Sequence, residues 1–176
     1  MFYMSDFVMY VLDTNVLLAL QNHYFPTIFI SLWEDINKLI EQNKIISIVK
    51  VQEEIASLEH KIFWDNINQN HNFNFYRELV SGEEQELVKI EKLEIYSKII
   101  IKNKHGTNVE WSLQKEWGEG VAIADPLLIC HALKHGSTIV TTESPKNQLN
   151  IPHVCKELNV KCIGIKKFFI ENELQF

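Results

Sequence analysis

The chain has 176 residues and a hydrophobic fraction of 46%, enough for one domain with a substantial core. Its formal net charge of −6 argues against non-specific nucleic-acid binding through a basic face, although clustered acids that hold metal would contribute to the same deficit. The three cysteines show no pairing pattern, which predicts thiols in a reducing cytoplasm. The sequence shows no signal peptide and no apolar run of about 20 residues, so it predicts neither export nor a membrane span.

The N-terminal part of the chain predicts strands and helices in alternation. Capping side chains after the first apolar run, and Pro26 after the first helix, give the helix starts. The predicted elements are a strand at 7–12, a helix at 14–20, a helix at 27–42, a strand at 45–47, a helix at 49–58 and an irregular connection at 66–76. The apolar face of the second helix comprises Ile28, Leu32, Ile36, Leu39 and Ile40.

The C-terminal part continues this alternation after a middle segment with weaker signals. Asp125 and Pro126 are typical of a helix start, and Gly136 of a helix end. The predicted elements are helices at 81–102, 109–117, 125–134, 151–158 and 166–172, and strands at 138–142 and 160–165. The pattern predicts an α/β sandwich with a largely parallel sheet, formed by a single domain over 1–176 with a helical insertion at 63–118.

Four acidic residues stand beside, or at the end of, short apolar stretches: Asp13, Glu54, Asp125 and Glu143. A carboxylate at the end of a buried strand is costly unless it is paired, hydrogen-bonded or bound to a cation. Several carboxylates that converge repel one another, and a divalent cation offsets that repulsion. The pattern therefore predicts a hydrolase of phosphodiesters that depends on Mg²⁺ or Mn²⁺.

Glu53 and Glu54 compete for the second acidic position. In the predicted helix over 49–58 and beyond, one apolar stripe comprises Val51, Ile55, Leu58 and Ile62. Glu54 flanks this stripe and Glu53 points to the opposite, solvated side. We therefore predict that Glu54 faces a cleft, the alternative being a solvated pair on a surface helix.

Three short motifs in order along this pattern resemble those of the PIN-domain nucleases. They are Tyr-Val-Leu-Asp-Thr-Asn at 10–15, Ala-Asp-Pro at 124–126 and Ile-Val-Thr-Thr-Glu at 139–143. Further stretches at 30–33, 45–47, 53–55 and 151–163 resemble a bacterial branch of PIN-like proteins that includes toxins of type II toxin–antitoxin systems. The resemblance covers about 8–60 and 120–170, and residues 63–118 match no family pattern.

The resemblance implies a three-layer sandwich with a central, mainly parallel sheet, and a metal-dependent endoribonuclease whose products carry a 5′-phosphate and a 3′-hydroxyl. It implies that Mg²⁺ or Mn²⁺ is held by the catalytic acids Asp13, Glu54, Asp125 and Glu143. Supporting hydrogen bonds would come from Thr14, Asn15 and Thr142. It also implies a cognate antitoxin that inserts a peptide near the acidic cleft, and a homodimer.

Other interpretations of these residues stay open from sequence. Asp13 and Asp125 both suit helix capping, and Glu143 suits a solvated loop before a turn. A catalytically silent PIN-like binding module is one alternative. A different α/β phosphohydrolase is another, but the chain lacks its phosphate-binding loop. His131 and His135 have the spacing of a zinc pair, without an evident third ligand.

Overall fold

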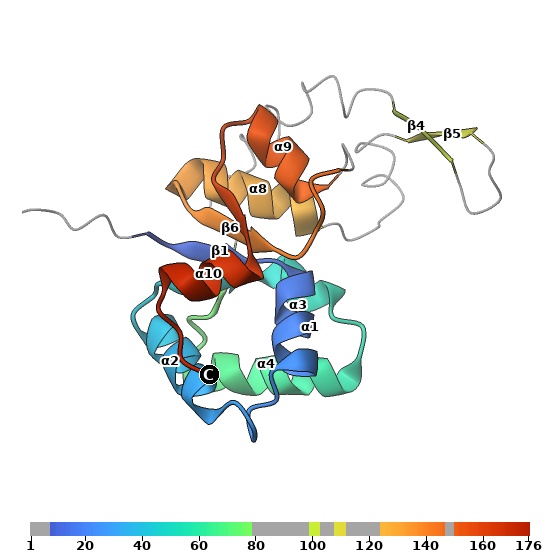
Figure 1. Cartoon of the computed structure of the whole chain (residues 1–176). Coiled ribbons are helices and arrows are strands. Elements are labelled where there is room, and N and C mark those ends of the chain that lie inside the picture. The colour runs from blue at the N-terminus through green and yellow to red at the C-terminus, as the bar shows by residue number, and fades with distance from the viewer. Residues whose placement is uncertain (1–7, 79–98, 103–107, 112–123, 147–149) are drawn as a thin grey trace, which may run out of the picture.

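A computed structural model describes residues 8–78, 99–102, 108–111, 124–146 and 150–176. Its centre is a five-stranded sheet in the order β3-β2-β1-β6-β7, in which every neighbouring pair is parallel (Figure 1). The strands are β1 (Tyr10–Leu12), β2 (Ile45–Ile48), β3 (Tyr76–Arg77), β6 (Thr138–Thr141) and β7 (Cys162–Gly164). The predicted α/β class with a mainly parallel sheet is confirmed.

The three central strands are short runs in which every residue is buried. Such continuous burial is typical of a parallel sheet covered on both faces. The register places Tyr10 beside both Ile45 and Thr138, and Leu12 beside Val140. The carboxyl ends of β1 and β6 are therefore level with each other.

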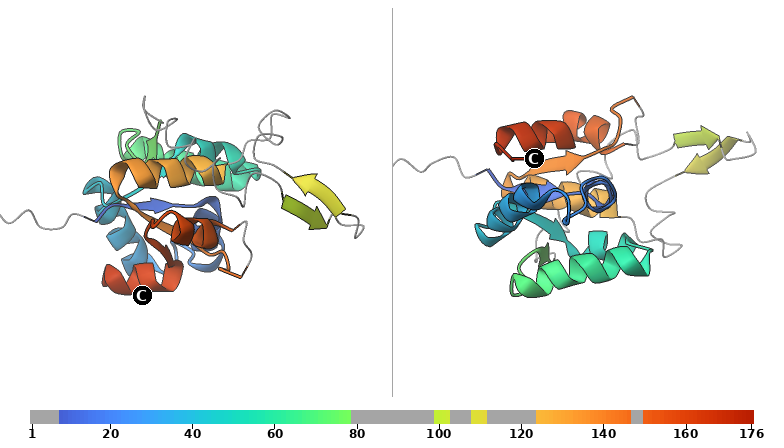
Figure 2. Two further views of the ribbon diagram at one scale, coloured as in Figure 1. Left: turned by 90° about the horizontal axis from the view of Figure 1, so that it is seen from above. Right: turned by 60° about the horizontal axis from the view of Figure 1, so that its bottom comes forward.

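Helices flank this sheet on both sides. In the left view of Figure 2, α8 lies on one side of β1, and α1 and α2 lie on the other. The helices are α1 (Thr14–His23), α2 (Ile30–Glu41), α3 (Val49–Glu54), α4 (Leu58–Asn70), α8 (Ala124–His135), α9 (Ile151–Glu157) and α10 (Ile165–Glu171). The architecture is a three-layer α/β sandwich of the kind that PIN-like domains adopt.

Two helix predictions in the first half were wrong in their bounds. The second helix begins at Ile30 and not at 27, so Ile28 is 69% exposed and does not belong to the buried face. The helix predicted over 49–58 ends at Glu54, and a new helix begins at Leu58. The break at 55–57 rotates the following residues, so the predicted stripe holds for Val51 and Ile55 but leaves Leu58 and Ile62 exposed.

The irregular connection predicted over 66–76 was also wrong, because α4 continues to Asn70 and β3 begins at Tyr76. The reason is a tertiary contact that local sequence does not reveal. The side-chain oxygen of Asn68, inside α4, accepts hydrogen bonds from the backbone N–H groups of Phe75 and Tyr76. These bonds turn the chain sharply back into the sheet.

In the middle of the chain, the structure describes strands where helices were predicted. β4 (Ile99–Lys102) and β5 (Asn108–Trp111) form a separate two-stranded antiparallel sheet, apart from the sandwich in Figure 2. Three consecutive β-branched isoleucines at 99–101 favour a strand over the end of a helix. The remaining parts of the two predicted helices, 81–98 and 112–117, lie outside the described residues, as does much of the predicted helical insertion.

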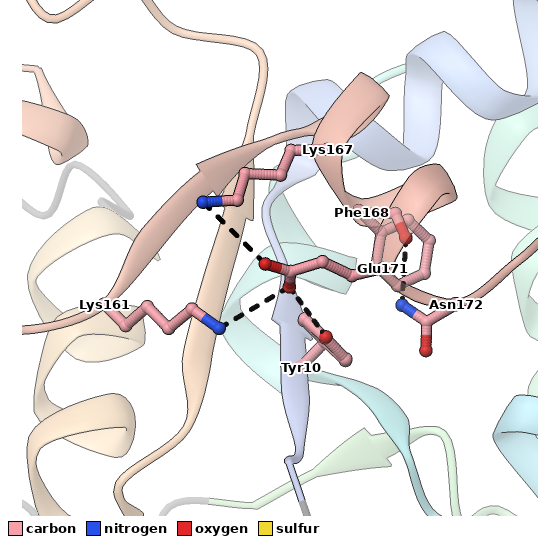
Figure 3. Close-up of polar contacts among 6 residues, drawn as sticks. All are labelled: Tyr10, Lys161, Lys167, Phe168, Glu171 and Asn172. Carbon is pink, nitrogen blue, oxygen red and sulfur yellow. Dashed lines mark hydrogen bonds and ion pairs between the residues drawn. The ribbon is translucent and has the colours of Figure 1, made fainter.

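Tyr10, at the amino edge of the sheet, is bonded to the C-terminal helix α10. Tyr10 donates a hydrogen bond of 2.9 Å from its hydroxyl to Glu171 of α10 (Figure 3). Lys161 and Lys167 form ion pairs with the same carboxylate at 3.5 and 3.8 Å. The opposite, carboxyl edge is where the acidic residues gather. No helix among the described residues is long and apolar enough to cross a membrane.

Candidate active site at the carboxyl edge of the sheet

The four predicted acids come from four segments that reach the same edge of the sheet. Asp13 follows the last residue of β1, and Glu143 lies two residues beyond the end of β6. Glu54 ends α3, which begins directly after β2, and Asp125 is the second residue of α8. Because the strands are parallel, their carboxyl ends share one edge, which is where α/β sheets place their binding sites.

Asp13 is almost fully buried, with 1% of its surface exposed. It occupies the N-cap position of α1, and its backbone carbonyl accepts hydrogen bonds from the N–H groups of Val16 and Leu17. Its carboxylate makes no capping bond. Instead, Oδ2 accepts hydrogen bonds from Thr141 Oγ1 at 2.8 Å and Asn15 Nδ2 at 3.4 Å. The capping interpretation therefore holds for the Asp13 backbone and not for its side chain.

Glu54 joins three helices through its two carboxylate oxygens. Oε2 accepts a hydrogen bond of 2.6 Å from Thr14 Oγ1 in α1, and Oε1 accepts one of 2.6 Å from the backbone N–H of Ala124, the first residue of α8. That N–H is one of the donors that a helix start leaves without an internal acceptor. Glu53 is exposed and forms an ion pair of 2.5 Å with Lys50. The structure thus directs Glu54 toward the other acids and Glu53 into solvent.

Asp125 is half-buried. It lies in the first turn of α8, since the helix begins at Ala124 and not at Asp125. Burial, followed by the negative charges of Asp13, Glu143 and Glu54, raises the pKa of Asp125 from 3.8 to about 8. Burial raises the pKa of Asp13 to about 6, the charges of Glu143 and Glu54 add to this effect, and the Thr141 hydrogen bond opposes it. The four carboxyl groups therefore form one electrostatically coupled cluster, which we call the acidic cluster.

Glu143 is half-buried and bonded at both its backbone and its side chain. Its N–H donates to Thr141 Oγ1 at 3.1 Å, and its Oε2 accepts a hydrogen bond of 2.8 Å from the N–H of Ile151, the first residue of α9. These bonds link β6 to α9 across the segment between them. The interpretation of Glu143 as a plain solvated loop acid does not describe this residue.

Of the predicted supporting residues, Thr14 and Asn15 both bond to acids of the cluster. The third, Thr142, has an exposed side chain, and the hydroxyl that contacts Asp13 is that of Thr141. Sequence reasoning placed the support one residue too late. The signal for Thr141 is the strand register: Leu12 pairs with Val140, so the next residues, Asp13 and Thr141, are neighbours.

The donor atoms of the acidic cluster fit a hard divalent cation, since they are carboxylate oxygens whose mutual repulsion such a charge would offset. In the arrangement described, no three Asp, Glu, His or Cys side chains are grouped closely enough to hold a metal ion, within the described parts of the chain. Both oxygens of Glu54 already accept hydrogen bonds. Asp13, Asp125 and Glu143 are the acids best able to supply ligand atoms, and Glu54 would need to release a hydrogen bond first.

The two histidines with zinc-like spacing lie on α8, with ring centroids 4.5 Å apart. His131 is buried and His135 is exposed. No third side chain completes a metal site with them among the residues that the structure describes. The structure therefore gives no support to the zinc interpretation.

Comparison with known proteins gives a family but no activity. Residues 10–176 match the profile of a family described as "Domain of unknown function (DUF4411)". The search of curated proteins finds no match. The match spans all four acids and most of the chain.

Proposed function

We propose that this chain, which belongs to the DUF4411 family of domains of unknown function, is an endoribonuclease that depends on Mg²⁺ or Mn²⁺. The observation that carries the proposal is the acidic cluster, in which Asp13 is buried and Asp125 is half-buried despite the cost of their charges. Strongly shifted pKa values of this kind gather at functional sites. A cluster that serves only the fold would be more stable with neutral side chains.

The residues of this chain divide into two roles under the proposal. Asp13 and Asp125 would hold the cation, with Glu143 supplying a further oxygen. Thr141 fixes the rotamer of Asp13, and Glu54 fixes the start of α8 and hence the position of Asp125. When bound, the cation supplies Lewis-acid chemistry: it polarises the phosphodiester and makes water a better nucleophile near neutral pH.

RNA as the substrate, and the role of a toxin, are supported by the likeness of the motifs at 10–15, 124–126 and 139–143 to PIN-domain nucleases. A cognate antitoxin would oppose the acidic cluster with Lys or Arg side chains. Expression of the chain alone should arrest growth, and co-expression with the product of a neighbouring small gene should restore it. Unimpaired growth at high levels of folded protein would contradict the toxin role while leaving the ribonuclease open to direct assay.

The direct assay is incubation with tRNA, rRNA and mRNA fragments in Mn²⁺, with an EDTA control. We expect endonucleolytic products in Mn²⁺ and none in EDTA. Asp13→Asn keeps the size of the side chain and its acceptor for Thr141 but removes the charge, so it should abolish cleavage. Cleavage by this variant at the rate of the wild type would refute the proposal.

One observation favours a second candidate, a catalytically silent binding module. Four of the carboxylate oxygens, Oδ2 of Asp13, both of Glu54 and Oε2 of Glu143, are already engaged by donors of the chain itself. An acidic cluster satisfied internally has less need of a cation. Calorimetric titration with Mn²⁺ separates the two candidates: binding at or below millimolar concentration supports the nuclease, and its absence supports the silent module.

A further inference from the structure

A concave site lies on the other side of α3 from the acidic cluster. It is a cavity of about 430 Å³ between α3, α4 and β3, and its walls include Val49, Gln52, Asp65, Asn68, Tyr76 and Glu78. Gln52 and Glu54 are two residues apart on α3, which corresponds to a rotation of about 200° around a helix. Gln52 therefore faces this cavity while Glu54 faces the acidic cluster, and α3 is a wall that the two sites share.

The polar groups of the cavity are held in fixed orientations. Asp65 Oδ1 accepts a hydrogen bond of 2.6 Å from Gln52 Nε2. Asn68 Oδ1 accepts hydrogen bonds of 3.1 and 3.2 Å from the N–H groups of Phe75 and Tyr76, so its oxygen is occupied and the group that Asn68 presents to a ligand is its amide, a donor. The Tyr76 side chain is buried, and its hydroxyl has no hydrogen-bond partner among the described residues. An unsatisfied buried hydroxyl carries a desolvation cost, which a partner that reaches it would offset.

An exposed aromatic ring stands at the rim of the same cavity. Phe73 lines it and is 67% exposed. Both Asn72 and Phe73 have positive φ angles, 55° and 60°, a conformation that is rare for a bulky residue. The turn is held by a hydrogen bond of 2.8 Å from the Phe73 N–H to the Asn68 carbonyl. The backbone is thus strained in a way that displays this ring in solvent, and such strain gathers at binding sites.

The chemistry of the walls selects the class of ligand. None of the described residues that line the cavity is Lys, Arg or His, and two are carboxylates, so a phosphate is repelled. An aromatic platform with amide and carboxylate groups around it suits an unstacked nucleobase. Carboxylates accept hydrogen bonds, and guanine offers N–H donors from its ring and its N2 amino group, together with an O6 acceptor for an amide such as that of Asn68.

We propose that this cavity binds an unstacked guanine base of single-stranded RNA. On the opposite side of α3, the acidic cluster receives a phosphate of the same strand. Only the placement of a phosphate at the acidic cluster rests on the proposed ribonuclease function, and the binding of the base does not. A helix with side chains is about 10–12 Å across. A strand that crosses α3 can therefore place a base in the cavity and a nearby phosphodiester at the acidic cluster.

The binding half is tested without catalysis. Guanosine, which carries no phosphate, is titrated into the full chain in EDTA and followed by amide chemical shifts, with adenosine, cytidine and uridine in parallel. We expect guanosine to bind most tightly and to shift signals of Gln52, Asn68 and Tyr76. Phe73→Ala should weaken binding by about fivefold or more through loss of the stacking surface. Asp65→Asn should weaken guanosine binding comparably, because the side-chain amide of the variant has an N–H donor where the carboxylate has an acceptor oxygen.

Two exposed residues give matched controls: Phe25→Ala for the ring and Glu59→Gln for the acid on α4, neither of which lines the cavity. Both should bind guanosine as the wild type does. Absence of guanosine binding at millimolar concentration, or binding that Phe73→Ala and Asp65→Asn leave unchanged, overturns the proposal.

Cleavage mapping then separates this inference from the nuclease proposal. If both hold, the wild type cleaves at a fixed distance from a guanine and Phe73→Ala loses that preference while it still cleaves. Guanosine binding with no cleavage of any RNA removes the nuclease proposal and leaves the base site. Cleavage with no guanosine binding removes the base site and leaves the nuclease.

Discussion

Thr141 Oγ1 donates a hydrogen bond of 2.8 Å to Asp13 Oδ2, between residues 128 positions apart in the chain. The same hydroxyl oxygen accepts a bond from the Glu143 N–H. One buried hydroxyl thus fixes the carboxylate at the end of β1 and the chain direction after β6. This contact ties β1 to β6 at the edge where the acidic cluster lies.

Thr141→Val removes that hydroxyl with little change in side-chain size. We expect the free energy of unfolding to fall by about 1–3 kcal/mol, because a buried acceptor and a backbone donor lose their partner. The pKa of Asp13 should rise, since the Thr141 hydrogen bond lowers it. Denaturant unfolding and a carboxyl NMR titration measure the two effects. Thr142→Val, at an exposed position, should change stability by no more than about 0.5 kcal/mol; equal losses from both variants would contradict the role of Thr141.

Glu54→Gln should destabilise the protein more than Glu53→Gln does. The glutamine amide introduced by this change has only one oxygen, so either the Thr14 hydroxyl or the Ala124 N–H loses its acceptor, at a cost of about 1–3 kcal/mol. Glu53→Gln breaks an exposed ion pair with Lys50 and should cost under about 1 kcal/mol. Thermal or chemical unfolding of the two variants side by side measures the difference, and similar losses would show that the Glu54 contacts contribute little.

Stability should fall as pH rises from about 5 to about 8.5. The pKa values of Asp13 and Asp125 are raised in the folded protein to about 6 and about 8 from an ordinary value of 3.8, so the folded state holds more protons than the unfolded state in this window. The free energy of unfolding then decreases with pH, by on the order of a few kcal/mol. Asp125→Asn should flatten the upper part of the profile, and a wild-type profile that is already flat would contradict the coupling.

Mn²⁺ should stabilise the protein more at pH 8.5 than at pH 5. At the higher pH the acidic cluster is ionised and its repulsion is greatest, while at pH 5 Asp13 and Asp125 hold their protons, which compete with a cation. We expect the melting temperature to rise with Mn²⁺ at pH 8.5 and to change little at pH 5. Asp13→Asn should remove the rise, and an equal rise in this variant would place the cation elsewhere.

Tyr10→Phe tests whether the two edges of the sheet are independent. Loss of the hydrogen bond to Glu171 should cost about 1 kcal/mol of stability, because the hydroxyl has a charged partner that stays accessible to water. Mn²⁺ affinity should be unchanged, since this contact lies at the amino edge, away from the acidic cluster. Calorimetry and unfolding curves give both numbers, and a coupled loss of affinity would show that the edges communicate.

Local sequence was most informative where one face of an element repeats a simple pattern. The buried strands at 10–12, 45–48 and 138–141, and the helix ended by Gly136 with its φ of 67°, could be found from apolar runs and turn residues. The break at 55–57 could not, since Leu58 and Ile62 continue a helical apolar spacing yet are exposed. Whether an apolar stripe is buried depends on which surface lies opposite, and local periodicity carries no record of that surface.

By itself, the sequence determined the α/β class and the four acids at the ends of apolar segments. A strand buried on both faces is a continuous run of apolar residues, and an acid beside such a run stands out because burying its charge is costly. Only the tertiary structure decided that these acids converge, that Thr141 and not Thr142 supports Asp13, and that Glu54 is engaged at both oxygens. The physical reason is that electrostatic coupling and hydrogen bonding depend on distances of a few ångströms between distant residues. Those distances are set by strand register and helix packing across the whole fold.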